Sequence, residues 1–211
     1  MKLQLALDRM TIAEAIELTK KVETSVDWIE VGTSLIKEFG MNSVRELKNA
    51  FPDKVIVADM KTIDNARYEF EIAFQAGADV VTVMGVSPLV TIEACMETAE
   101  RHNKAVMVDL LNTSDEQIQE LVKFEKAVFC AHVSKDEQEE SGAKNLGAKN
   151  DSLLTEQGLQ LAAAGGITLE SLEGLRKNLN PAVVIVGSAI TKAADPSKAA
   201  QKFKQAMITE E

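Results

Sequence analysis

The sequence predicts a single-domain (β/α)8 TIM barrel, an α/β fold in which eight parallel strands close into a cylinder inside a ring of helices. Short apolar runs alternate with longer stretches of helical period eight times along the 211 residues. Most of the runs are apolar at every position, which is typical of parallel strands buried on both faces. The turn after the first run lacks a GxGxxG motif, which counts against the alternative of a doubly wound open sheet.

The first half of the chain carries four strand-helix pairs. Thr11 and Glu14 form a capping-box pattern that starts the first helix, and Gly77 marks the end of the third. Pro88 suits the first turn of the fourth helix. The predicted strands lie at residues 3–7, 28–31, 55–58 and 79–84, and the second to fourth helices at about 34–51, 65–76 and 88–102.

The second half repeats this pattern less regularly. Residues 134–158 are polar and contain two copies of Gly-Ala-Lys-Asn, which are too short for a repeat architecture and which we interpret as loop. The last helix begins near Asp195 and Pro196. The predicted strands lie at residues 105–108, 127–131, 159–164 and 182–186, with a helix at about 114–124. One domain over residues 1–211 accounts for all of these elements.

Charge and composition narrow the classes of partner. The 23 Lys and Arg against 33 Asp and Glu give a net charge of −10 without a basic cluster, so nucleic-acid binding is not expected. No apolar run is long enough to cross a membrane, and Asp8 comes too early for a signal peptide. Cys95 and Cys130 lie in apolar stretches without a CxxC motif, which favours two buried thiols in a cytoplasmic protein.

Polar residues gather where the predicted strands end. In barrels of this kind the active site lies at the carboxyl ends of the strands and in the loops that follow. One carboxylate there is usually a solvated loop residue or a helix cap, but several at one barrel mouth, with a lysine and a histidine, indicate a site. The residues are Asp8, Glu30, Asp59, Lys61, Asp64, Asp109 and His132.

Asp59 and Lys61 are the centre of this predicted site. They are two residues apart, so the period of a strand places both side chains on one face, inside the barrel. A lysine among carboxylates stays protonated and can stabilise developing negative charge. Glu30 and Asp59 offer hard oxygen ligands from neighbouring strands, which suits Mg²⁺.

The other strand-end residues have expected roles of their own. His132 closes the sixth strand at the barrel mouth, where an imidazole suits proton transfer near neutral pH. Asp8 and Asp109 are expected to bind the substrate. Asp64 comes after the third strand, where it is either part of the catalytic set or the N-cap of the next helix.

Two loops predict a phosphate site. Gly165 and Gly166 follow the seventh strand, and Gly187, Ser188 and Ala189 follow the eighth. Glycines let the backbone approach a ligand closely, and N–H groups at a helix start attract an anion. Many barrels bind phosphate with these last two loops, so a phosphorylated small molecule is the expected ligand.

These residues resemble the orotidine 5′-monophosphate decarboxylase suprafamily, and within it the 3-hexulose-6-phosphate synthases. The resemblance covers nearly the whole chain, and its most specific element is the Asp-x-Lys-x-x-Asp signature at Asp59, Lys61 and Asp64. It implies a (β/α)8 barrel that works as a homodimer with active sites at the subunit interface. Asp64 then serves the site of the partner subunit.

The resemblance also implies a reaction. Synthases of this kind condense formaldehyde with D-ribulose 5-phosphate to give D-arabino-hex-3-ulose 6-phosphate, reversibly. Mg²⁺ on Glu30 and Asp59, together with Lys61, would stabilise the enediolate that forms when His132 removes a C1 proton. The sugar phosphate and formaldehyde are therefore the expected small-molecule partners, with the phosphate held by the two glycine loops.

Two alternatives remain at this point. The related 3-keto-L-gulonate 6-phosphate decarboxylases usually carry an Arg after the last loop glycine and further Arg near the strand-six histidine, where this chain has Ser188 and the run 133–136. That difference favours the synthase, although synthases usually have Gly at the position of Ser134. The other alternative is a catalytically silent sugar-phosphate-binding barrel, which the intact aspartate and lysine signature counts against.

Overall fold

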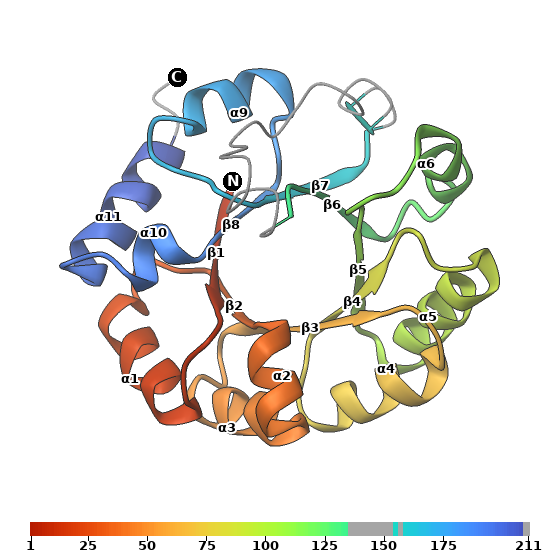
Figure 1. Cartoon of the computed structure of the whole chain (residues 1–211), viewed down its shortest axis with the longest axis horizontal. Coiled ribbons are helices and arrows are strands. Elements are labelled where there is room, and N and C mark those ends of the chain that lie inside the picture. Colours follow the sequence, from red (N-terminus) through yellow and green to blue (C-terminus); the bar gives the residue numbers. More distant parts are fainter. Residues whose placement is uncertain (135–153, 156–157, 209–211) are drawn as a thin grey trace.

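The computed structural model describes residues 1–134, 154–155 and 158–208, and they form the predicted barrel. Eight parallel strands pair in sequence order and close between the last and the first (Figure 1). The strands are β1 (Lys2–Leu7), β2 (Trp28–Val31), β3 (Val55–Thr62), β4 (Val80–Met84), β5 (Ala105–Asp109), β6 (Val128–His132), β7 (Gln160–Ala164) and β8 (Val183–Val186). The (β/α)8 prediction is confirmed.

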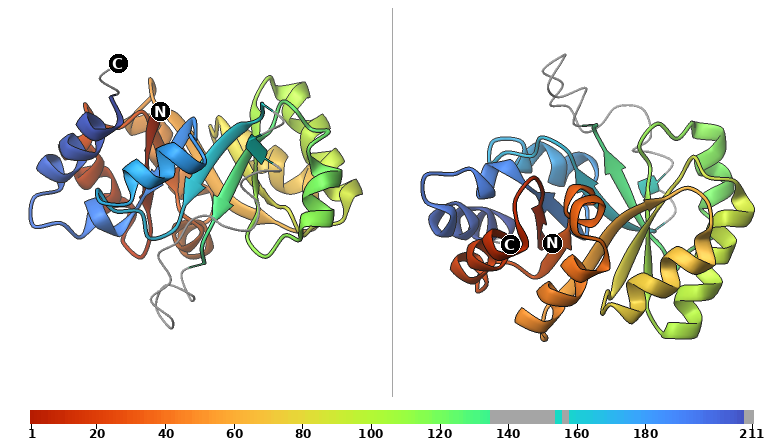
Figure 2. Two further views of the ribbon diagram at one scale, coloured as in Figure 1. Left: turned by 90° about the horizontal axis from the view of Figure 1, so that it is seen from above. Right: turned by 60° about the horizontal axis from the view of Figure 1, so that its bottom comes forward.

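The helices surround the strands, as the further views in Figure 2 also show. The predicted capping box is present, since Thr11 and Glu14 bond each other's backbone N–H groups at the start of α1. Asp195 caps the last helix, as predicted. The helices are α1 (Ile12–Val22), α2 (Thr33–Phe39), α3 (Met41–Ala50), α4 (Ala66–Gln75), α5 (Leu89–His102), α6 (Asp115–Leu121), α9 (Leu172–Asn178), α10 (Ser188–Thr191) and α11 (Pro196–Met207).

Two element predictions are wrong. The helix expected at 34–51 is two helices, because Gly40 adopts a φ of +60° between them, a conformation open to glycine. β3 ends at Thr62, four residues beyond the predicted 58. The loop expected at 134–158 and its short repeat lie mostly outside the described residues.

None of the helices that the structure describes has both the length and the apolar composition to cross a membrane.

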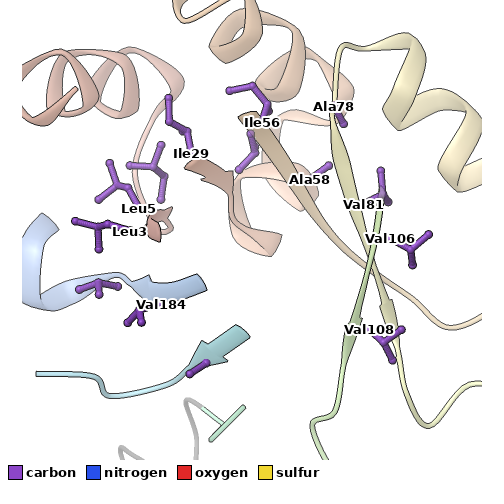
Figure 3. Close-up of a cluster of buried hydrophobic side chains, with 14 of the residues drawn as sticks. Leu3, Leu5, Ile29, Ile56, Ala58, Ala78, Val81, Val106, Val108 and Val184 are labelled. Atoms are coloured by element: carbon purple, nitrogen blue, oxygen red, sulfur yellow. The ribbon is translucent and has the colours of Figure 1, made fainter. Parts of the chain in front are cut away.

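An apolar layer joins the strands to the helices. It contains alternate strand residues such as Leu3 and Leu5 of β1, Val81 of β4 and Val106 of β5 (Figure 3). Successive side chains of a strand point to opposite faces, so the residues between these face the barrel interior.

The barrel interior has an apolar part and a polar part. Val57, Val80, Met107, Val128, Cys130, Ala162, Ala164, Val183 and Ile185 form the apolar cluster. Two residues further along four of these strands the interior positions are polar: Asp59, Thr82, Asp109 and His132. On β2, Glu30 follows Trp28, which packs against the cluster, by the same two residues. The apolar part fills the barrel, which leaves the polar part at the carboxyl end for a ligand. Cys95 and Cys130 are free and buried, as predicted.

Candidate active site

Lys61 is the centre of the polar part of the barrel interior. Its Nζ lies 2.7 Å from Asp109 Oδ2 and 3.3 Å from Asp59 Oδ1. Burial alone would lower the pKa of Lys61, but the charges of Asp59 and Asp109 outweigh it and raise the pKa above its usual value. Lys61 therefore holds a permanent positive charge between two carboxylates.

His132 is held by the same aspartate. Its Nδ1 lies 3.0 Å from Asp109 Oδ1 and 2.9 Å from Oδ2. Burial alone would raise the pKa of Asp109, but the hydrogen bond and charge of His132, together with Lys61, hold that pKa well below its usual range. An ionised Asp109 favours the proton on Nδ1, which leaves Nε2 of His132 to exchange a proton with a ligand.

Glu30 is buried on β2. Its Oε2 accepts a hydrogen bond of 2.5 Å from Nε2 of Gln4, a buried residue of β1. Burial raises the pKa of Glu30 to about 8, and the negative charge of Asp59 adds to the increase. The protein groups around Glu30 thus leave its ionised form poorly stabilised, and a bound cation would supply the missing positive charge.

Glu30 and Asp59 fit a Mg²⁺ ion by their donor chemistry. Asp59 Oδ2 accepts a hydrogen bond of 2.5 Å from Thr33, and Oδ1 accepts one of 2.9 Å from Thr82. A carboxylate oxygen can accept twice, so Oδ2 keeps room for a cation. Within the described residues, no three His, Cys, Asp or Glu side chains form a group able to hold a metal. Two carboxylates are nevertheless sufficient for Mg²⁺, which takes its other ligands from water and substrate.

Asp8 lies at the end of β1, beside the start of α2. Its Oδ1 accepts hydrogen bonds from the backbone N–H of Ser34 at 3.2 Å and from the Ser34 hydroxyl at 2.7 Å. A Cβ on Gly32 would lie 2.4 Å from the Asp8 carboxylate, so only glycine leaves space for this side chain. Asp8 is exposed, which suits contact with a ligand at the barrel mouth.

The pairing of β3 with β4 is interrupted between Ala58 and Thr62, the segment that carries Asp59 and Lys61. Ala58 pairs with Val81 of β4, and the next recorded pair is Thr62 with Val83. The regular strand period from which we placed Asp59 and Lys61 on one face is therefore absent here, although both side chains do meet inside the barrel, 3.3 Å apart. The backbone of Lys61 has a φ of +48°, and its N–H donates to the Thr82 hydroxyl at 2.9 Å.

Asp64 stands apart from this cluster. It is exposed, and its carboxylate has no hydrogen bond or ion pair with another described residue. It is also not the N-cap of α4, since Asn65 occupies that position without a side-chain bond. The alternative role as a helix cap is therefore wrong, and the predicted catalytic role stays a prediction.

The two glycine loops follow β7 and β8. Gly165 and Gly166 have φ values of +99° and +63°, and a Cβ on Gly165 would lie 2.3 Å from the Val133 carbonyl oxygen. Gly187 precedes α10, whose first residues Ser188 and Ala189 carry N–H groups that have no acceptor within the helix. These loops therefore present backbone to the barrel mouth, where an anion could bind.

Comparison with known proteins assigns nearly the whole chain to one protein family. Residues 1–203 match the family described as Orotidine 5'-phosphate decarboxylase / HUMPS family. This chain belongs to that family. The family resemblance predicted from the signature at Asp59, Lys61 and Asp64 is thus confirmed.

Within the family, the similarity is higher to synthases than to a decarboxylase of the alternative class. The chain is 38% identical over 210 residues to the 3-hexulose-6-phosphate synthase of Bacillus subtilis (strain 168), covering 99% of both. The crystal structure of 3-hexulose-6-phosphate synthase from Salmonella typhimurium superposes with a TM-score of 0.89 at 38% identity, covering 98% of each chain. The 3-keto-L-gulonate-6-phosphate decarboxylase from Vibrio cholerae has a TM-score of 0.84 at 27% identity, covering 97% of this chain and 96% of its own.

Several residues of this family member were not predicted as part of the site. Gln4 and Thr82 contact the buried carboxylates from within the strands, and Thr33 does so from the start of α2. A signal for two of them was present, because Gln4 and Thr82 are polar residues at interior positions of otherwise apolar strands. Gly32 and Ser34 carried no comparable signal, since their role depends on where Asp8 comes to lie.

Proposed function

We propose that this chain catalyses the reversible aldol condensation of formaldehyde with D-ribulose 5-phosphate, the reaction of a 3-hexulose-6-phosphate synthase. The observation that carries the proposal is the Lys61 ammonium, 2.7 Å from Asp109 in the polar part of the barrel interior. A fixed positive charge suits a reaction that develops negative charge on a sugar oxygen. The 38% identity to synthases over nearly the whole chain supports the choice of substrates.

In the proposed reaction His132, Lys61 and Asp109 each have a different role. Nε2 of His132 removes a proton from C1 of ribulose 5-phosphate, and negative charge moves onto the oxygen of the neighbouring carbonyl. Lys61 stabilises that charge, and Asp109 keeps both Lys61 and His132 in place. C1 then bonds to the carbon of formaldehyde while the sugar carbonyl re-forms, and the formaldehyde oxygen takes the proton from Nε2 of His132 and becomes a hydroxyl. The reverse reaction breaks the same bond and releases formaldehyde.

The substrate is bound from three sides in this proposal. The backbone at Gly165 and Gly166 and at the start of α10 holds the 5-phosphate. Glu30 and Asp59 hold a Mg²⁺ ion, which supplies positive charge to the sugar oxygens when bound. Asp8, already oriented by Ser34, accepts a hydrogen bond from a sugar hydroxyl.

The first test compares two substrates. With Mg²⁺ present, the purified protein is expected to consume ribulose 5-phosphate and formaldehyde in equal amounts, measured as loss of formaldehyde and a new phosphate ester signal in ³¹P NMR. It is expected to release no CO₂ from 3-keto-L-gulonate 6-phosphate, since Ser188 stands where those decarboxylases usually carry Arg. Release of CO₂ without consumption of formaldehyde would assign the decarboxylase activity instead.

We further propose that two copies of the chain share their active sites. Three large apolar side chains are exposed near the start of α4 and α5: Ile63 at 57%, Tyr68 at 61% and Val90 at 69%. Asp64 lies beside Ile63 and has no described partner in its own chain. A second copy packed on this surface would cover the apolar side chains and bring each Asp64 toward the other barrel.

Complementation tests this shared arrangement. Lys61→Ala and Asp64→Ala variants are each expected to keep at most about 1% of wild-type activity alone. A mixture that exchanges subunits is expected to regain roughly a quarter of wild-type activity, because half of the dimers are mixed and each has one intact site. Two variants of the same residue, Lys61→Ala with Lys61→Met, serve as the control and should regain none. If both mixtures behave alike, each active site is built by one chain.

A further inference from the structure

β3 departs from regular pairing where it carries Lys61. The four steps from Ala58 to Thr62 on β3 lie opposite only the two steps from Val81 to Val83 on β4. Lys61 lies in this extra length with a φ of +48°, in the left-handed region that a residue other than glycine rarely adopts. The backbone of an active-site lysine is therefore in a strained segment where the strand ladder does not fix it.

Thr82 of β4 makes the contacts that the interrupted ladder lacks. Its Oγ1 accepts a hydrogen bond of 2.9 Å from the backbone N–H of Lys61 and donates one of 2.9 Å to Asp59 Oδ1. The same Asp59 oxygen lies 3.3 Å from Nζ of Lys61. One hydroxyl thus links the backbone of Lys61 to the carboxylate that contacts its ammonium. Thr82 is buried, so bulk water does not compete for these bonds.

We propose that Thr82 is a positioning residue for Lys61, and that its hydroxyl, rather than its bulk, sets the place of the lysine ammonium. A hydroxyl has one proton and two lone pairs, so it can donate to a carboxylate and accept from an N–H at once. Valine has nearly the same shape and can do neither. The consequence for turnover rests on the proposed function, but the positioning is a property of the free protein.

The first measurement is hydrogen exchange at the backbone amide of Lys61 in three variants. Thr82→Val is expected to speed this exchange about tenfold, because the amide loses its acceptor. Thr82→Ser keeps the hydroxyl and is expected to exchange like the wild type. Thr98→Val is the matched control, since Thr98 is a buried threonine on α5 whose hydroxyl bonds the Ala94 carbonyl of the same helix.

The second measurement is steady-state turnover of the same variants. Thr82→Val is expected to lower kcat by about 10–100-fold, since a small misplacement of a charge-stabilising group has effects of that size. KM for ribulose 5-phosphate should change less than about threefold, because the phosphate loops and Asp8 are untouched. Thr82→Ser and Thr98→Val should keep most of the wild-type kcat.

The outcomes separate this proposal from the proposed function. Unchanged exchange at Lys61 in Thr82→Val, or an equal kcat loss in Thr82→Ser and Thr82→Val, overturns the role of the hydroxyl. If Thr82→Val does not fold, Thr82→Cys, which has a similar size and only a weak donor, takes its place in the same comparison. A wild-type protein without synthase activity removes the proposed function, while the exchange measurement still decides the role of Thr82.

Discussion

Replacing Lys61 with alanine is expected to lower kcat for the condensation by about 10²–10³-fold, the usual effect of removing one preorganised charge-stabilising group. The ammonium of Lys61 is held by Asp109 at 2.7 Å and by Asp59 at 3.3 Å. Another cationic side chain could take over its role only by forming new contacts with both carboxylates. The measurement is steady-state kinetics with ribulose 5-phosphate and formaldehyde in the presence of Mg²⁺. KM for the sugar phosphate should change little, because the phosphate loops stay intact.

The control for this experiment is a lysine outside the site. Lys126 pairs with Glu100 at the protein surface, and Lys126→Ala should keep full activity. Removing Lys61 also leaves two buried carboxylates without their cation, so its variant must be shown to be folded by circular dichroism at the assay temperature. A folded Lys61→Ala protein that turns over at the wild-type rate would show that the ammonium does not act in the reaction.

The second large effect is expected from Glu30. Chelation of divalent cations should abolish activity, and added Mg²⁺ should restore it. Glu30→Gln should stay inactive at every Mg²⁺ concentration, with kcat reduced by about 10²-fold or more, because it loses the charge of one of two proposed protein ligands. The measurement is activity against free Mg²⁺ for both proteins. Full activity of the wild type in excess chelator would contradict the proposed metal.

The same substitution has an opposite expected effect on stability. Burial raises the pKa of Glu30 from 4.5 in the unfolded chain to about 8, so the folded protein takes up a proton that the unfolded chain lacks between these values. In this range the unfolded chain gains stability by ionising Glu30 while the folded chain keeps it protonated, so the metal-free fold loses stability as pH rises from about 4.5 to 8. Glutamine has no charge to bury. In excess chelator, Glu30→Gln should melt at a higher temperature than the wild type, by a margin that grows over this pH range.

The alternation of apolar runs and helical stretches was sufficient to predict the barrel. Helix caps were predicted from local chemistry, as at Thr11 and Asp195, because such a cap depends on residues a few positions apart. The break at Gly40 was missed because a glycine inside a helical pattern can be tolerated or can end the helix. Packing of the surrounding elements decides between the two.

For the site, the sequence was sufficient to predict which residues belong to it but not which contacts they make. Strand-end position identified Lys61, Asp109 and His132 as members of one site, because parallel strands bring their carboxyl ends to one mouth. It did not identify the pairs they make, such as Asp109 with both Lys61 and His132. Nor did it identify the interruption in β3, since the pairing of β3 with β4 depends on contacts between residues more than twenty positions apart in sequence.

The extra length of β3 implies that stability and turnover make different demands on the segment that carries Lys61. A strand with two fewer residues between Ala58 and Thr62 could pair with β4 without interruption and without a left-handed residue. Such a barrel would have one residue between Ala58 and Thr62, which is too few to carry both Asp59 and Lys61. Mutagenesis that selects only for resistance to heat should therefore accumulate changes in this segment, and selection for turnover should remove them.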